Sequence, residues 1–206
     1  MSGGGQMRLS GGRRLLSPGG RTARPTTSRV REAVMNILAP HLEDCRWLDL
    51  CSGSGVMGCE ALQRGARCVV AVDQNPQCSR ISRSNLSAVA ASRSPTPEIR
   101  TERRELIAWL RKGWSQEPFD IVYFDPPYDQ GLYEPGLDAL AQGNWLHQDS
   151  LVVCEYRSNL NPVPGSGWSV LDQRRYGISG VLLLSPPERC HRGGTGSKPP
   201  QTDPSG

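Results

Sequence analysis

Two short motifs of this sequence contain residue types that could bind a ligand and act on it. The first is Gly53-Ser54-Gly55-Val56-Met57-Gly58, which follows an apolar segment and precedes a helix-forming one. Glycines in such a turn permit unusual backbone angles and let a ligand approach the main chain closely. Asp73 follows Gly53 by 20 residues, at the end of the next apolar segment, where a carboxylate can accept both hydroxyls of a ribose. This spacing fits a nicotinamide dinucleotide or any other cofactor that carries adenosine.

Asp49 favours a cationic ligand over a dinucleotide. It lies in Leu48-Asp49-Leu50, just before the glycine turn. A carboxylate at this position would repel a pyrophosphate and attract a sulfonium or an ammonium group. The same side chain could also brace the turn by accepting backbone N–H bonds, and the two roles can coexist.

The second motif is Asp125-Pro126-Pro127-Tyr128, which follows the apolar residues 121–124. Two prolines restrict the backbone and remove amide hydrogens, so that a carboxylate and an outward carbonyl remain as acceptors. Together they suit an exocyclic NH2 group, which donates twice, and Tyr128 can stack on the base that carries it. Holding both hydrogens would localise the nitrogen lone pair and make this amine a better nucleophile.

The elements that must position these motifs alternate between strand and helix from Arg46 onwards. Such alternation predicts an α/β fold with a mostly parallel sheet and helices on both faces. We expect seven strands, of which the last two form an antiparallel hairpin around residue 177. Ligands bind beyond the carboxyl ends of parallel strands, so both motifs should meet in one crevice.

Charge is concentrated at the N-terminus. Residues 1–31 carry seven arginines and no acidic residue, although the net charge is only +4. Arginine contacts phosphate through two parallel hydrogen bonds and stacks on bases, so this leader favours RNA or DNA. The RNA-contacting candidates are Arg8, Arg13, Arg14, Arg24, Thr26, Thr27 and Arg29. Thr26 or Thr27 could also cap a helix that Pro40 ends.

Composition excludes several other classes of protein. The chain has 206 residues, no run of 18 apolar residues and no secretory signal, so we expect neither a membrane span nor export. Its seven cysteines form no C-x-x-C pair, which favours a reducing cytoplasm and predicts no metal site. We expect a basic extension over residues 1–24, a folded domain over 25–185 and a disordered tail over 186–206, in a monomer.

The motifs LDLCSGSGVMG and FDPPY, with the acid of AVDQN between them, resemble those of S-adenosylmethionine-dependent amino-methyltransferases. The stretch RPTTSRVREAVMNIL and the basic leader RLSGGRRL are similar to bacterial 16S ribosomal RNA guanine-N2 methyltransferases. The resemblance covers residues 7–185. It implies a Rossmann-like class I methyltransferase fold, S-adenosyl-L-methionine as the cofactor, and 16S rRNA or the assembling small ribosomal subunit as the partner.

The resemblance also implies roles for individual residues. Asp49, Ser52, Gly53 and Gly55 would hold the methionine end of the cofactor. Asp73 would hold the ribose, with Gln74, Glu105 and Leu106 near the adenine. Asp125, Pro126, Pro127 and Tyr128 would hold the target base, while Arg24, Thr26 and Thr27 would close over the cofactor or the substrate.

Three alternatives remain open. An adenine-N6 DNA methylase, or another RNA amino-methyltransferase, shares the Asp-Pro-Pro-Tyr motif, although the DNA enzymes normally need a further recognition region. A nicotinamide oxidoreductase would explain the glycine turn and leave the proline loop unexplained. A non-catalytic RNA-binding assembly factor would not need Asp49, Asp73, Gly55 and Asp125 intact.

Overall fold

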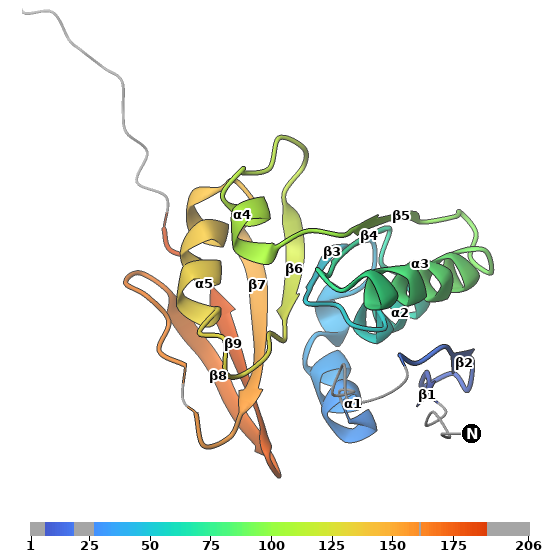
Figure 1. The fold of residues 1–206 in the computed structure, drawn as a ribbon, viewed down its shortest axis with the longest axis horizontal. Coiled ribbons are helices and arrows are strands. Elements are labelled where there is room, and N and C mark those ends of the chain that lie inside the picture. Colours follow the sequence, from blue (N-terminus) through green and yellow to red (C-terminus); the bar gives the residue numbers. More distant parts are fainter. Residues whose placement is uncertain (1–6, 19–26, 161, 189–206) are drawn as a thin grey trace, which may run out of the picture.

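The computed structural model describes residues 7–18, 27–160 and 162–188. Their main feature is a seven-stranded sheet in the order β5-β4-β3-β6-β7-β9-β8, as Figure 1 shows. Strands β3 to β7 are parallel, and β9 runs antiparallel to both of its neighbours. The prediction of a mostly parallel α/β sheet with an antiparallel C-terminal hairpin is therefore confirmed. The strands are β3 (Arg46–Leu50), β4 (Cys68–Val72), β5 (Glu98–Glu102), β6 (Phe119–Phe124), β7 (Leu146–Arg157), β8 (Ser169–Tyr176) and β9 (Ser179–Ser185).

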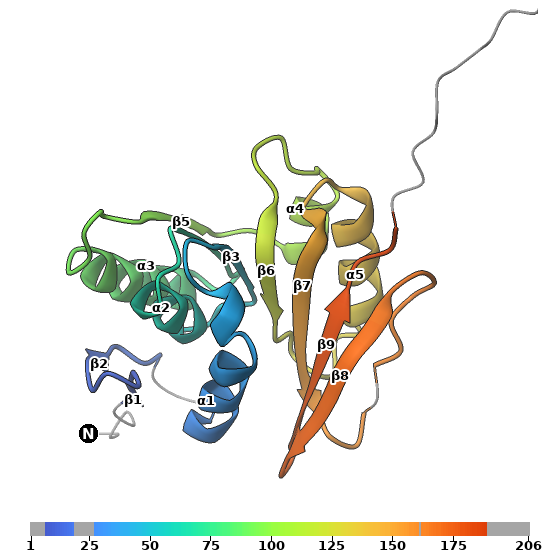
Figure 2. The ribbon, with the colours of Figure 1, turned by 180° about the vertical axis from the view of Figure 1, so that it is seen from behind.

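Helices cover both faces of this sheet (Figures 1 and 2). One hydrophobic cluster joins the first face to α1 (Ser28–Ile37), α2 (Val56–Gln63) and α3 (Pro76–Ala90). A second cluster joins the opposite face to α4 (Leu106–Leu110) and α5 (Tyr133–Gln142). The short 3-10 helix η1 (Ala39–His41) follows α1. Strands β3 and β4 are buried at every position, which explains why they read as apolar runs in the sequence.

A two-stranded antiparallel pair, β1 (Met7–Arg8) and β2 (Arg14–Leu15), lies beside α2 and α3 (Figure 2). Two buried side chains attach it. Glu60 of α2 accepts hydrogen bonds from the backbone N–H and the hydroxyl of Ser10, at 2.9 and 3.0 Å. Asn85 of α3 accepts from the Leu16 N–H at 2.9 Å and donates to the Leu16 carbonyl at 3.0 Å.

Arg31 differs from the other described arginines of the basic leader in its surroundings. Its side chain is buried, and its Nε lies 2.9 Å from the Glu60 carboxylate. Its Nη2 donates to the Arg8 carbonyl at 2.7 Å, so it links α1 to the N-terminal pair. The charge of Arg31 therefore stabilises the fold, whereas Arg8 and Arg14 have exposed side chains.

Some predictions lie outside the described residues. These are the roles of Arg24 and Thr26 and the disorder expected for residues 189–206. In the ranges that are described, no helix combines the length and the apolarity needed to span a bilayer.

Candidate functional site

A cavity of about 460 Å³ opens at the carboxyl ends of β3, β4, β6 and β7. Its size is typical of sites for small molecules and cofactors. Both sequence motifs contribute to its wall, so the crevice expected between them is present. The predicted residues that line it are Asp49, Ser52, Gly53, Asp73, Gln74, Glu105, Leu106, Asp125, Pro126, Pro127 and Tyr128.

The glycine turn connects β3 to α2 and has no side chains at Gly53, Gly55 and Gly58. Gly55 has φ 73° and forms the N-cap of α2, a left-handed conformation that favours glycine. A Cβ atom on Gly55 would also lie 2.5 Å from the Ser82 hydroxyl, and one on Gly58 would lie 2.8 Å from Val69 Cγ1. Gly55 is not itself part of the cavity wall. It shapes the turn that places Ser52 and Gly53 there.

Asp49 is almost completely buried at the base of this turn. Its Oδ2 accepts a hydrogen bond from the Gly58 N–H at 3.1 Å, in the first turn of α2. Burial raises the pKa of Asp49 from 3.8 to about 7; the Gly58 N–H opposes this rise, and the neighbouring Asp73 adds to it. The side chain therefore braces the turn, as considered from the sequence, and also faces the cavity with a carboxyl group that titrates near neutral pH.

Asp73 links the two loops that follow β3 and β4. Its Oδ2 accepts from the Gly53 N–H at 2.9 Å, and its Oδ1 accepts from the Asn75 N–H at 2.8 Å. Burial raises its pKa, and both N–H groups oppose that shift. A carboxylate has about four acceptor positions, so Asp73 can hold both loops and still accept from a ligand.

Glu105 and Leu106 lie at the start of α4, on the side of the cavity next to β4 and β5. The Glu105 carboxylate caps this helix by accepting from the N–H groups of Ile107, at 3.0 Å, and Ala108, at 2.7 Å. Leu106 is buried and Gln74 is exposed at the rim. Together they offer an apolar surface and an amide to a flat ring.

The Asp-Pro-Pro-Tyr loop begins where β6 ends. Pro126 is buried, Asp125 and Tyr128 are half-buried, and Pro127 is exposed. The Tyr133 hydroxyl, at the start of α5, donates to the backbone carbonyl of Glu155 in β7. This contact fastens the far end of the loop to the neighbouring strand, and the prolines stiffen its near end.

Several cavity residues were not predicted from the sequence. Tyr123 and Glu155 lie in apolar strands without a recognisable motif, and Met7, Ser17 and Pro18 come from the N-terminal segment. Burial holds the pKa of the Cys51 thiol, which also lines the cavity, above its ordinary value, and the carboxylates of Asp73 and Asp125 raise it further. Cys51 therefore stays protonated near neutral pH and is not a nucleophile.

Five RNA-contacting candidates lie among the described residues but outside this wall: Arg8, Arg13, Arg14, Thr27 and Arg29. Thr27 is the N-cap of α1, and its hydroxyl accepts from the Val30 N–H at 3.3 Å. The Arg13 guanidinium donates to the Ala88 carbonyl at the end of α3. Arg29 is exposed on α1. The helix-capping role predicted for Thr26 or Thr27 thus falls to Thr27.

Comparison with known proteins gives consistent relatives. The chain is 34% identical over 174 residues to ribosomal RNA small subunit methyltransferase D of Escherichia coli, an alignment that covers 82% of this chain and 84% of that protein. The corresponding protein of Haemophilus influenzae is 29% identical over 172 residues and covers 84% and 88% of the two chains.

A solved structure supports the same relationship. The candidate methyltransferase yhhF of Escherichia coli superimposes with a TM-score of 0.76 at 32% identity, over 90% of this chain and all of that one. The fold is thus that of class I methyltransferases. The family model described as Conserved hypothetical protein 95 matches residues 4–185, and the chain belongs to that family.

Proposed function

We propose that this protein transfers a methyl group from S-adenosylmethionine to the exocyclic N2 amine of a guanine in 16S ribosomal RNA. One observation carries the proposal: the glycine turn with its two aspartates and the Asp-Pro-Pro-Tyr loop line the same cavity. The names of the relatives from Escherichia coli and Haemophilus influenzae support ribosomal RNA of the small subunit as the substrate.

The residues around the glycine turn fit this cofactor. Asp73 offers a carboxylate already oriented by two backbone N–H groups, which suits a pair of ribose hydroxyls. Asp49 is a buried acid beside the turn, which suits the positively charged methionine end. When bound, the cofactor supplies a methyl group on a cationic sulfur and accepts the electron pair of the broken carbon–sulfur bond.

The loop after β6 provides the acceptors for the amine. Asp125 and the Pro126 carbonyl would each accept one hydrogen of N2, and Tyr128 would stack on the guanine ring. This orients the nitrogen lone pair toward the methyl carbon. As the new carbon–nitrogen bond forms, the surplus proton leaves the nitrogen for Asp125 or water. Most of the acceleration would come from alignment of the two reactants in a cavity that excludes water.

The exposed arginines of the N-terminal segment would bind the RNA backbone. Arg8 and Arg14 have exposed side chains on β1 and β2, close to the cavity wall formed by Met7 and Ser17. Deleting the segment would remove that wall as well as the charge, so substitution tests the idea better. The double variant Arg8→Gln and Arg14→Gln should bind RNA more weakly and show a smaller dependence of binding on salt, while its affinity for S-adenosylhomocysteine stays unchanged.

Mass-spectrometric mapping of nucleosides tests the function directly. Small-subunit RNA from cells that lack this protein should gain N2-methylguanosine at one position when incubated with the protein and S-adenosylmethionine. The inactive control is the Asp125→Ala variant. Methylation at adenine N6 would instead establish the alternative amino-methyltransferase. If no nucleoside in RNA, in assembled 30S particles or in DNA gains a methyl group, the proposal is wrong and a non-catalytic role is favoured.

A further inference from the structure

Glu155 places a second carboxylate in the part of the cavity that contains the Asp-Pro-Pro-Tyr loop. Glu155 lies in β7 and is only 2% exposed to solvent. It lines the cavity together with Asp125, Pro126 and Tyr128. The methyl-transfer mechanism above gives Glu155 no role. Buried carboxylates are costly unless they are hydrogen-bonded, so a glutamate at the wall of a ligand cavity needs a reason.

The register of the sheet puts Glu155 beside Asp125. Phe124 of β6 is the partner of Cys154 in the parallel β7, so Asp125 and Glu155 are the next residues of the two neighbouring chains. Adjacent strands lie about 4.8 Å apart. Val153 pairs with Tyr123 and shares a face of the sheet with Glu155, because side chains two residues apart point the same way. Glu155 therefore lies on the same face of the sheet as Tyr123, whose partner on β3 is Asp49.

Two tyrosines from different elements hold Glu155 in position. The Tyr123 hydroxyl, from β6, donates to Oε2 of Glu155 at 2.5 Å. The Tyr133 hydroxyl, from the start of α5, donates to its backbone carbonyl. The Tyr123 contact orients this group, and a carboxylate can accept several hydrogen bonds at once.

Two neighbouring carboxylates match the edge of one kind of base. On guanine, the N1–H and the N2 amine lie side by side, and both groups donate hydrogen bonds. Adenine and cytosine present an amine beside a ring nitrogen that bears a lone pair, and this lone pair would face the second carboxylate with no hydrogen between them. Failure to pair a buried polar group costs far more than loss of a similar contact in water.

We infer that Glu155 accepts the N1–H of the target guanine while Asp125 and the Pro126 carbonyl hold N2, and that Glu155 thereby selects guanine over adenine and cytosine. This inference rests on the proposed function. It assigns the choice of base to a residue outside the Asp-Pro-Pro-Tyr motif, which amino-methyltransferases acting on other bases share.

The test replaces the target guanine by 2-aminopurine, which keeps the 2-amino group but has a lone pair at N1. It uses the smallest substrate that the wild-type protein methylates, and it measures single-turnover rates at saturating S-adenosylmethionine. The wild-type protein should methylate guanine about 10- to 100-fold faster than 2-aminopurine. Equal rates on the two bases would overturn the inference, whatever the variants do.

The variants then connect the selectivity to the side chain. Glu155→Gln is isosteric, and its amide oxygen can still accept from Tyr123, whereas its NH2 group can donate to the N1 of 2-aminopurine. This variant should lose guanine activity and shrink the preference for guanine to about threefold or less, with unchanged affinity for S-adenosylhomocysteine. The matched variant Tyr123→Phe removes the orienting hydroxyl but keeps the Glu155 carboxylate, so it should reduce the preference for guanine less than Glu155→Gln does.

These outcomes separate the inference from the proposed function. If the Glu155→Gln variant keeps the wild-type preference, or if Tyr123→Phe reduces the preference more than Glu155→Gln does, Glu155 does not select the base and the inference is wrong. If the wild-type protein forms no N2-methylguanosine at all, the proposed function fails first. Melting temperatures of both variants show whether they are folded, and the wild-type comparison of the two bases decides the matter if they are not.

Discussion

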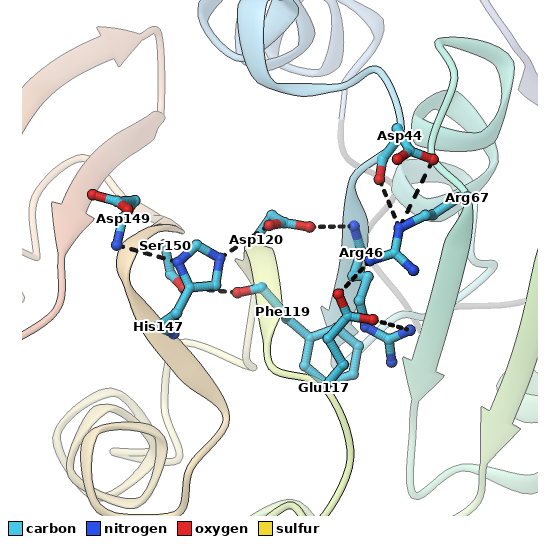
Figure 3. A network of polar contacts seen from close by, with 9 residues as sticks. All are labelled: Asp44, Arg46, Arg67, Glu117, Phe119, Asp120, His147, Asp149 and Ser150. Carbon is cyan, nitrogen blue, oxygen red and sulfur yellow. Dashed lines mark hydrogen bonds and ion pairs between the residues drawn. The ribbon is translucent and has the colours of Figure 1, made fainter.

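Acidic residues gather at both ends of the parallel sheet, but their surroundings differ. At the amino end, Asp44, Glu117 and Asp120 lie among basic side chains at the protein surface (Figure 3). At the carboxyl end, Asp49 and Asp73 lie in the cavity wall, where backbone N–H groups are their hydrogen-bond donors.

The amino-end network links the starts of four strands, β3, β4, β6 and β7. Arg67 contacts Glu117 at 2.5 Å, which lowers the pKa of the Glu117 carboxyl. Asp120 accepts from the Arg46 N–H at 2.6 Å and lies 2.9 Å from Nε2 of His147. In Figure 3 Arg67 contacts both Asp44 and Glu117, and His147 contacts Asp120, so each of these three acids has a side-chain partner in the network.

At the carboxyl end the pKa shifts run the other way. Burial raises the pKa values of both Asp49 and Asp73 above those of ordinary aspartates. A carboxylate whose ionised form is destabilised in the free protein gains more from a cationic or donor-rich ligand than one already paired with arginine. The raised pKa values of Asp49 and Asp73 and the lowered one of Glu117 thus agree with the ligand-binding role that we propose for the two carboxyl-end acids.

The largest expected effect concerns the acid that would touch the reacting amine. Asp125→Ala should lower the rate of methyl transfer by about a thousandfold, because one of the two acceptors that align N2 is lost. Calorimetric affinity for S-adenosylhomocysteine should stay within about twofold of wild type. A variant that retains a tenth of the activity would show that Asp125 does not align the amine.

Next in size is the loss of the Asp73 carboxylate, for which we propose ribose binding. Asp73→Asn should weaken binding of S-adenosylhomocysteine by about 100-fold, because an amide supplies only one acceptor oxygen where two are needed. Calorimetry measures the affinity. The amino-end variant Asp44→Asn is the matched control and should bind normally. Equal affinities for the two variants would contradict the distinction between the ends of the sheet.

The pH dependence of cofactor binding should report Asp49. Its pKa of about 7 lies above the ordinary value of 3.8, so below pH 7 the free protein favours the protonated form, and the protein loses stability as pH rises between these two values. A cationic ligand needs the ionised form, so affinity for S-adenosylmethionine should fall, by up to about tenfold per pH unit, as pH drops below 7.

Asp49→Asn supplies the control for this titration. The variant should show a smaller slope of affinity against pH between about 5.5 and 7.5. An unchanged slope would mean that Asp49 braces the turn without facing the cation.

The smallest effect is expected at the amino end. Arg67→Met removes the contacts to Glu117 and Asp44, both of which are exposed ion pairs. It should leave methyl transfer within about twofold of wild type and lower the melting temperature by less than about 3 °C. A large loss of activity with an unchanged melting temperature would show that the two ends of the sheet are coupled.

The architecture, and the position of both motifs at one edge of the sheet, could be predicted from the sequence. Buried parallel strands leave unbroken apolar runs such as residues 69–72 and 121–124, and each is followed by a loop that carries an acid. Topology alone then brings Asp73 and Asp125 to the same edge of the sheet. The element order was therefore enough to predict where the cavity lies.

The residues that were missed depend on register and on long-range packing. Glu155 is a single acid in the apolar run around residues 151–156, and only the pairing of β7 with β6 shows that it lies beside Asp125. A lone acid inside a buried strand was a usable signal, since Asp49 has the same pattern. Arg31 was counted with the exposed leader because no local feature of α1 shows that Glu60 would bury it.

The attachment of β1 and β2 has a consequence for how the chain folds during synthesis. Among the residues that the structure describes, the hydrogen-bond partners of residues 7–18 outside this segment come from later in the sequence: Arg31, Ser54, Glu60, Arg64, Asn85 and Ala88. A pair with two residues in each strand is too short to be stable alone. This pair can therefore make all of its contacts only once α3 has been synthesised, and one wall of the cavity is completed only after the helices on that face have formed.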